Sequence, residues 1–359
     1  MSGRVGAESS PPLTFLIPHV SLMRRLPVYL VLDCSESMVG EPIQAIDSGI
    51  QAMLRQLRSD PQALETAWLS IITFSAGAKV LMPLTELYQF QMPKLTLGSG
   101  TALRAALTLL EQRVAEEVRK STPDRRGDYK PIIFVLTDGD PTDEWEPAAD
   151  RFKREFGQQR ATVVAVLCGE DTSPGKMRRI TDQVVLAKNL DDATLKTVFN
   201  WVSASISSAS QSVESPNRIQ LGKDEALKEA EEADFSRSAE SDKNVFLHSR
   251  CLKNSQLYIM KYRREGRASK KASYQSESSH AVSEFDFGKS DAADLKIASD
   301  RLFGQPPCTY CSNHLWAMCS CGRIHCAPDC SRGATLTCPW CKTTDHYGPA
   351  KFSVGRGAG

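Results

Sequence analysis

Short apolar runs alternate with longer segments of helical periodicity between residues 27 and 210. Continuous apolar runs are typical of parallel strands buried on both faces. Four runs have this character: 27–33, 131–140, 161–169 and 184–188. In the longer segments apolar residues recur every three or four positions, which predicts helices. These helices are expected over 41–60, 100–120, 144–157 and 191–208.

One pair of apolar runs breaks this alternation. Residues 67–75 and 78–84 are separated only by Ala76 and Gly77, which is the pattern of a hairpin. A hairpin adds an antiparallel strand, and the alternation of strands and helices elsewhere predicts parallel pairing. We therefore expect an α/β, doubly wound, Rossmann-like fold whose mostly parallel sheet has one antiparallel edge strand.

The composition changes after residue 210 and defines the expected domains. Residues 211–243 are highly charged and predict a linker with a solvated helix over 223–233. Strand character returns at 244–251 and 256–264. The segment 271–285 is polar again, and a helix is expected over 291–304. The predicted organisation is a lead-in (1–24), a first domain (25–210), this linker, and a C-terminal domain (244–359) that contains a cysteine cluster (308–341).

Charge and hydropathy restrict the protein's environment and partners. The 359 residues carry a formal net charge of +1, so nucleic acid is not an expected partner. The basic stretch 261–271 is interpreted as a solvated strand end. Pro18 and His19 interrupt the apolar N-terminal segment, and no run approaches the roughly 18 apolar residues of a membrane span. We expect a cytoplasmic protein without a membrane anchor.

Oxygen-bearing side chains follow three of the predicted elements. Asp33, Ser35 and Ser37 come at every second position after the first strand, Thr101 opens a helix, and Asp138 ends the strand 131–138. In an extended turn alternate side chains point the same way, and the carboxyl ends of parallel strands share one edge of a sheet. Carboxylates and hydroxyls suit Mg²⁺ or Mn²⁺. The pattern predicts one such ion, with the alternative that these are turn and helix-capping residues.

This set resembles the metal-ion-dependent adhesion site of von Willebrand factor A domains, in the sequences DCSES, GTAL and TDGDPTD. The resemblance covers about residues 25–210 and implies a non-catalytic protein that binds a partner's carboxylate at an open position of the ion. Asp140 and Asp143 are interpreted as turn residues outside the metal shell. Cys34 is expected to point away from the ion as a buried thiol. A metal-dependent hydrolase is the alternative, although no flanking general base is evident.

Eight of the eleven cysteines lie in the last 52 residues, where C-x2-C pairs predict zinc binding. Eight thiolates suffice for two closed, structural Zn²⁺ sites, whereas disulfides are disfavoured in the expected compartment. Alternatives are one zinc held by the two C-x2-C pairs, or His314 or His325 in place of a cysteine. The predicted ligands are Cys308, Cys311, Cys319, Cys321, Cys326, Cys330, Cys338 and Cys341.

An A domain joined to an eight-cysteine module is similar to the TerY proteins of tellurium-resistance systems. In that family the second module is the TerY-C metal-binding domain. The resemblance implies a stress-response or phosphorylation context, with a protein kinase and a metal-dependent serine/threonine phosphatase as partners. The order of cysteine pairs is also RING-like, although its central spacing departs from the RING pattern. A RING-like interaction module is therefore an alternative interpretation.

Overall fold

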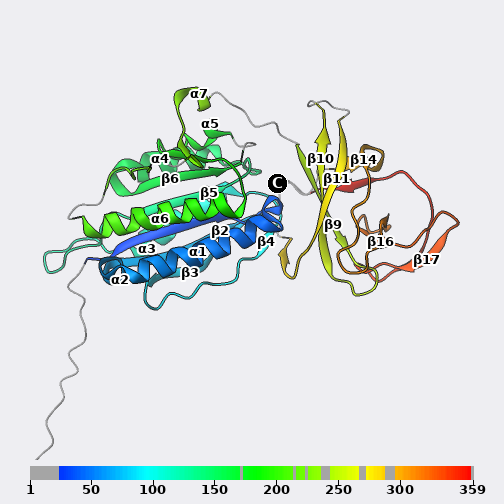
Figure 1. Ribbon diagram of the computed structural model, residues 1–359, viewed down its shortest axis with the longest axis horizontal. Coiled ribbons are helices and arrows are strands. Elements are labelled where there is room, and N and C mark those ends of the chain that lie inside the picture. Colours follow the sequence, from blue (N-terminus) through cyan, green and yellow to red (C-terminus); the bar gives the residue numbers. More distant parts are fainter. Residues whose placement is uncertain are drawn as a thin grey trace, which may run out of the picture.

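A computed structural model describes residues 24–169, 173–212, 216–222, 225–235, 243–266, 272–287 and 296–356. Two units lie side by side: a helix-flanked sheet formed by the first part of the chain, and a mainly β unit formed by the rest (Figure 1). Most of the predicted lead-in, residues 1–23, lies outside the described residues. In the part of the chain that is described, no helix is both long and apolar enough to cross a bilayer.

The first unit contains one large sheet and the helices around it. Its strands are β1 (Leu26–Asp33), β2 (Ala67–Phe74), β3 (Ala78–Glu86), β5 (Ile132–Thr137), β6 (Thr162–Cys168), β7 (Val184–Ala187) and β8 (Leu227–Glu229). Its helices are the 3-10 turn η1 (Glu36–Met38), α1 (Glu41–Ser59), α2 (Pro61–Thr66), α3 (Leu103–Glu117), α4 (Glu146–Arg160), α5 (Pro174–Met177), α6 (Asp192–Gln211) and α7 (Glu232–Phe235).

The sheet order is β3-β2-β1-β5-β6-β7-β8, with β1, β2, β5, β6 and β7 parallel. The predicted doubly wound, mostly parallel sheet is confirmed, and β3 is its expected antiparallel edge. The prediction of one antiparallel edge strand is wrong, because β8 pairs antiparallel with β7 at the other edge. This strand lies in the segment predicted to be a charged helix. Leu227 is buried while Lys228 is exposed, as suits an edge strand with one face in water.

Apolar residues cover both faces of the sheet, as continuous apolar strands require. On one face α1 and α6 pack against the strands, and they lie in front of the sheet in Figure 1. On the other face α3 and α4 enclose a second apolar cluster. Helix α4 continues past Gly157, where the sequence predicted its end. The two layers of helices hold the strands so that β1 and β5 end side by side.

The C-terminal unit is built on a six-stranded sheet. Its strands are β9 (Asn244–Arg250), β10 (Leu257–Glu265), β11 (Ser273–Ala281), β14 (Leu302–Phe303), β15 (Leu315–Met318) and β16 (Ile324–Ala327). The order β14-β11-β10-β9-β16-β15 places strands from before and within the cysteine-rich segment in one sheet. Smaller pairs join β13 (Lys296–Ala298) to β19 (Ser353–Gly355) and β17 (Ala334–Thr337) to β18 (Thr344–Tyr347).

One strand of this unit was not predicted, and one predicted helix is wrong. The polar segment after residue 272 forms strand β11, in which Tyr274 is buried and most other side chains are polar or exposed. The helix predicted over 291–304 is absent from its described part, 296–304, which holds β13, β14 and the 3-10 turn η3 (Ser299–Arg301). Residues 291–295, like 267–271 of the basic stretch, lie outside the described residues. Strands β11, β13 and β14 form by pairing with other strands of the unit rather than from local periodicity.

Candidate metal centres

Asp33 and the two serines after it form the first metal-binding loop at the end of β1. Asp33 accepts hydrogen bonds from the Ser35 backbone N–H at 2.9 Å and from the Thr137 hydroxyl at 2.5 Å. The loop is not extended throughout, since Ser37 lies in the 3-10 turn η1. Its hydroxyl nevertheless lies 2.9 Å from that of Ser35. The loop therefore gathers a carboxylate and two hydroxyls at the carboxyl edge of the sheet.

Asp138 joins this group from the neighbouring strand β5. Ser37 donates a hydrogen bond to an Asp138 carboxylate oxygen at 2.8 Å. The residue before Asp138, Thr137, is the donor to Asp33 described above, so the ends of β1 and β5 are tied together by side chains. A chain of polar contacts thus runs from Ser35 through Ser37 to Asp138. Four of the five predicted oxygen ligands lie in one connected cluster.

Thr101 is placed by backbone contacts from the loops on either side. Its N–H donates to the Thr142 hydroxyl, and its carbonyl accepts from the Thr142 N–H. Just before it, the Gly98 N–H donates to the Cys34 carbonyl at 2.8 Å, which joins the second loop to the first. The Thr101 hydroxyl is buried and has no hydrogen-bond partner among the described residues. A buried hydroxyl without a partner costs free energy, so this oxygen fits the role of a ligand to an ion.

Both acids in this cluster have raised pKa values. Burial raises the pKa of Asp33 to about 6. Burial and the negative charge of Asp33 raise the pKa of Asp138 to about 7. Asp33 is buried and Asp138 is partly exposed. Two neighbouring carboxylates that are poorly solvated favour protonation, and a divalent cation between them would offset their repulsion. The donor set of two carboxylates and three hydroxyls contains no soft ligand and therefore fits Mg²⁺ or Mn²⁺.

Glu36 is a buried acid of this site that the sequence interpretation missed. Its side chain is fully buried, and its carboxylate accepts hydrogen bonds from the Ser99 hydroxyl and the Gly100 N–H. Burial raises its pKa to about 7. Glu36 thus fixes the second loop, which carries Thr101, against the first. No sequence signal marks it, because its partners lie more than sixty residues away.

The neighbouring acids and the neighbouring thiol have other roles. Asp140 forms an ion pair with Lys176 at 2.7 Å. Asp143 accepts a hydrogen bond from the Arg104 N–H at the start of α3. The other carboxylate oxygen of Asp143 is buried and has no hydrogen-bond partner among the described residues, so the interpretation that these acids lie outside the metal shell stays a prediction. Cys34 is buried, and burial raises the pKa of its thiol far above its ordinary value.

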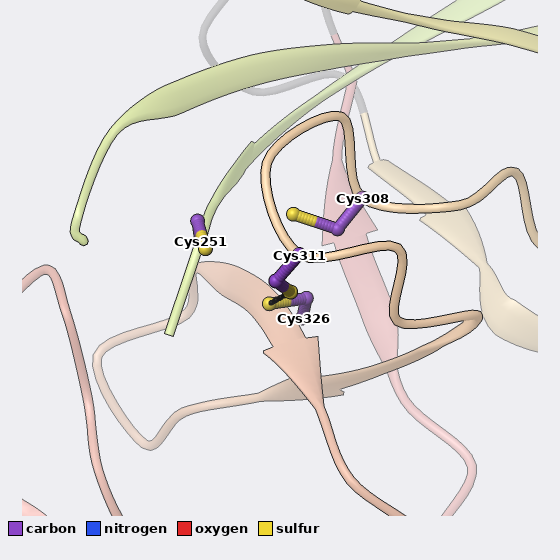
Figure 2. Close-up of side chains that lie close together, drawn as sticks. All are labelled: Cys251, Cys308, Cys311 and Cys326. Atoms are coloured by element: carbon purple, nitrogen blue, oxygen red, sulfur yellow. Dashed lines mark hydrogen bonds between the residues drawn. The ribbon is translucent and has the colours of Figure 1, made fainter. Parts of the chain in front are cut away.

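Four cysteines of the C-terminal unit form a first thiol cluster: Cys251, Cys308, Cys311 and Cys326. Figure 2 shows their sulfurs converging from the end of β9, the 308–311 loop and β16. Their sulfur atoms all lie within 4.8 Å of one another, and those of Cys311 and Cys326 are 3.6 Å apart. Tetrahedral Zn²⁺ with Zn–S bonds of about 2.3 Å separates sulfurs by about 3.8 Å. The cluster therefore fits a closed four-thiolate site.

A second thiol cluster consists of Cys319, Cys321, Cys338 and Cys341. The Cys319 and Cys341 sulfurs are 3.6 Å apart, and those of Cys321 and Cys338 are 4.0 Å apart. Cys321 and Cys341 are exposed, so this cluster opens to solvent more than the first. Because the two C-x2-C pairs belong to different clusters, the alternative of one zinc shared by both pairs is wrong.

Backbone turns explain how three of these cysteines are presented. After Cys308, the Ser312 N–H donates back to the Cys308 carbonyl, and Ser312 has a φ of 59°. The Lys342 N–H likewise donates to the Cys338 carbonyl, and Lys342 has a φ of 65°. Ser255 repeats this turn after Cys251, again with a φ of 59°. The three turns aim three sulfurs in the same way, although Cys251 has no second cysteine in its turn.

Cys330 was a predicted zinc ligand, and this prediction is wrong. Its sulfur contacts the Pro328 carbonyl at 3.3 Å, and it belongs to neither cluster. Cys251, which the sequence interpretation left outside the cysteine cluster, takes the fourth position of the first site. His314 and His325 also belong to neither cluster. His325 is fully buried, and its Nδ1 lies 2.9 Å from the Cys326 carbonyl.

Comparison with known families agrees with this architecture. A model of the von Willebrand factor type A domain matches residues 28–205, so the first unit is a von Willebrand factor A domain. A model of the TerY-C metal binding domain matches residues 241–359. The chain is thus a von Willebrand factor A domain protein with a C-terminal TerY-C metal-binding domain, as the sequence resemblance predicted. Among curated proteins, none matches this sequence.

Several solved structures match half of this chain or more. Proximal thread matrix protein 1 from the mussel byssus, with a zinc-occupied MIDAS motif, has 18% identity and a TM-score of 0.38, covering 51% of this chain and 48% of that one. The chain thus spans about half the length of that mussel protein. A von Willebrand factor type A protein from Catenulispora acidiphila has 19% identity and a TM-score of 0.36, covering 51% and 43%. The ArnB paralog VWA2 from Sulfolobus acidocaldarius has 13% identity and a TM-score of 0.36, covering 74% and 67%.

Proposed function

We propose that this protein is a non-catalytic adaptor whose A domain binds an acidic group of a protein partner through Mg²⁺ or Mn²⁺. Five residues would hold the ion: Asp33, Ser35, Ser37, Thr101 and Asp138. When bound, the ion supplies a position at which a partner's carboxylate can replace a water molecule. The chain's own residues orient this position, because the two carboxylates are fixed by Thr137 and Ser37.

The observation that carries this proposal is the unpartnered, buried hydroxyl of Thr101 beside two loops that present acids with raised pKa values. Turn and helix-capping roles would leave that hydroxyl bonded to backbone. Thr101 precedes α3, yet its side chain caps no helical N–H. A ligand role accounts for all five side chains together.

The two thiol clusters are proposed to hold one structural Zn²⁺ each. N–H groups of Leu252 and Trp340 point at the sulfurs of Cys326 and Cys338, at 3.1 and 3.4 Å. Such bonds favour the thiolate form that zinc requires. Reduced thiols in this number also favour a cytoplasmic location. Following the family resemblance, the proposed context is a tellurium-resistance or stress-response system with a protein kinase and a metal-dependent phosphatase as partners.

The test combines metal binding and partner capture. Calorimetry of the purified chain with Mn²⁺ should show one site that is lost in Asp33→Ala. The Asp140→Ala variant is the matched control and should bind as the wild type does. Capture of the purified kinase or phosphatase should require Mg²⁺ and fail in EDTA and in Asp33→Ala. Capture that is unchanged in both would contradict the proposal, and phosphoester turnover lost in Asp138→Ala would favour the hydrolase alternative.

A further inference from the structure

The C-terminal sheet lies against the edge of the A domain that carries the oxygen cluster. One face of β9, β10 and β11 packs on its own core with Tyr258 and Met260, next to the first thiol cluster. At alternate positions of β9 and β10, Phe246 and Ile259 belong to the same buried apolar cluster as the A domain core, and so does Val282, which follows β11. That cluster includes Met38 and Val39, which directly follow the first metal-binding loop. The two domains therefore share a buried apolar interface at this edge.

Two histidines of this sheet touch the first metal-binding loop and the start of α1. His248 Nε2 lies 3.5 Å from the buried Glu36 carboxylate. Its ring packs on that of Phe285, with centroids 4.7 Å apart. The His280 ring approaches Gly40 so closely that a Cβ atom on that glycine would lie 2.8 Å from it. The C-terminal domain therefore contacts the first loop at Glu36 and the chain just after it at Gly40.

The second metal-binding loop is covered by a strand pair between the domains. Strand β12 (Phe285–Asp286) pairs with β4 (Leu97–Gly98) in parallel. The Ser99 N–H also donates to the Asp286 carbonyl at 3.1 Å. Because β4 ends three residues before Thr101, this pairing fixes the loop that presents the unpartnered hydroxyl. Asp33 and Thr101 are each only 1% exposed in this arrangement, whereas Ser37 and Asp138, at the other side of the site, stay partly exposed.

The charge on this face opposes a metal ion. Lys261 of β10 lies two positions after Ile259 on the same strand, so its side chain leaves the sheet on the side that faces the A domain. Lys261 also forms an ion pair with Glu277 at 3.0 Å, which holds its side chain on this side of the sheet. A cation here stabilises the two acids without a metal and repels a divalent ion.

We propose that the C-terminal domain is a lid over the A domain metal site, and that an acidic partner binds only after strands β9 to β11 have moved off the site. This inference rests on the proposed function. The lid excludes a partner sterically through Ile259, His248 and His280, and it competes with the ion through the charge of Lys261. Because such coupling is reciprocal, occupancy of the metal site by ion and carboxylate must favour the open arrangement to the same degree.

An opening variant tests the lid. Ile259→Asp places a charge in the interface between the domains, while the opposite face of β10 keeps its core. Ile259→Val is the matched control and should behave as the wild type. The probe is Mn²⁺ alone: electron paramagnetic resonance gives its affinity, and water proton relaxation reports exchange of water on the bound ion. Ile259→Asp should bind Mn²⁺ about five-fold more tightly or better, with faster water relaxation.

Retention of two zinc ions shows that the C-terminal domain of a variant is folded. If Ile259→Asp loses its zinc, a second variant tests the lid instead. Lys261→Met removes the opposing charge without burying a new one and should raise the Mn²⁺ affinity about 3- to 10-fold. Lys351→Met, which alters an exposed lysine of the same domain, is its control. Mn²⁺ affinity and water relaxation unchanged in both Ile259→Asp and Lys261→Met would overturn the lid. If no variant and no wild-type chain binds Mn²⁺, the metal site itself is wrong, and the lid falls with it.

Discussion

Replacement of Cys251 by serine tests the ligand assignment that distinguishes the structure from the sequence interpretation. Cys251 is fully buried and provides one of four sulfurs within 4.8 Å. Serine preserves the size of the side chain but replaces a thiolate with a hydroxyl, which is a weak ligand for zinc. We expect Cys251→Ser to lose the first zinc ion selectively, because the second cluster shares none of its ligands.

The magnitude follows from the number of ligands. Structural Zn²⁺ sites contribute about 10–16 kcal/mol at pH 7. One of four equivalent thiolates then accounts for about 3 kcal/mol, which weakens zinc binding by roughly 100-fold. Since metal binding and folding are coupled, the same loss should lower the unfolding midpoint of the C-terminal domain by about 10 °C.

The assay is elemental analysis after dialysis against a chelator of intermediate affinity. Wild-type protein should retain two zinc ions per chain, and Cys251→Ser should retain one. Cys330→Ser is the matched control and should retain two, because Cys330 lies outside both clusters. The opposite pattern, with zinc lost in Cys330→Ser and kept in Cys251→Ser, would refute the assignment.

Two further predictions concern the A domain. The pKa values of Asp33 and Asp138 in the folded chain, about 6 and about 7, lie above the ordinary value of 3.8, so the metal-free protein should lose stability as the pH rises from about 4 to about 7. Added Mg²⁺ should reverse this loss in thermal unfolding scans, and Asp138→Asn should reduce the pH dependence without abolishing it, because Asp33 and Glu36 also have raised pKa values; a flat profile for the wild type would contradict the raised pKa values of these acids. At the other end of the sheet, Leu227→Ala should destabilise the A domain by about 2 kcal/mol and speed amide exchange in β7, since the apolar anchor of β8 is removed. Unchanged exchange in Val184–Ala187 would show that β8 does not protect that edge.

The oxygen cluster was predictable because its parts are local. Asp33 and Asp138 each end a strongly apolar strand, and the parallel order of such strands places their ends together. Glu36 was not predictable, since an alternating loop would turn it away from the ion. Its burial depends on Ser99 and Gly100, which reach it only through the folded arrangement of the second loop.

The zinc ligands were predictable where the motif is complete. In the turns after Cys308 and Cys338, another cysteine follows three positions later, and this C-x2-C spacing indicates a zinc site. After Cys251 the same turn has Asn254 at that position, so the backbone geometry is kept while the sequence signature is lost. Cys330 was predicted to be a zinc ligand because its segment contains eight cysteines, the number that two four-thiolate sites require. The sequence therefore gave no reason to look for a ligand outside this segment.

Strand β8 shows the limit of periodicity. Three residues are too few for a pattern, and a single buried leucine among charged neighbours resembles a solvated helix as much as an edge strand. Its pairing with β7 is determined by the free edge of the sheet, which is a property of the whole domain. The interface between the two domains was unpredictable for the same reason, because Phe246 and Ile259 look like ordinary strand residues.

The separation of Cys251 from its partners dictates an order of assembly during synthesis. The ribosome completes the A domain first, and the first thiol cluster cannot close until Cys326 has emerged. Throughout that interval the A domain lacks the completed C-terminal sheet that packs against the edge carrying Asp33 and Asp138. A lid of the kind proposed above would therefore admit a divalent ion more readily during synthesis than after the chain is complete.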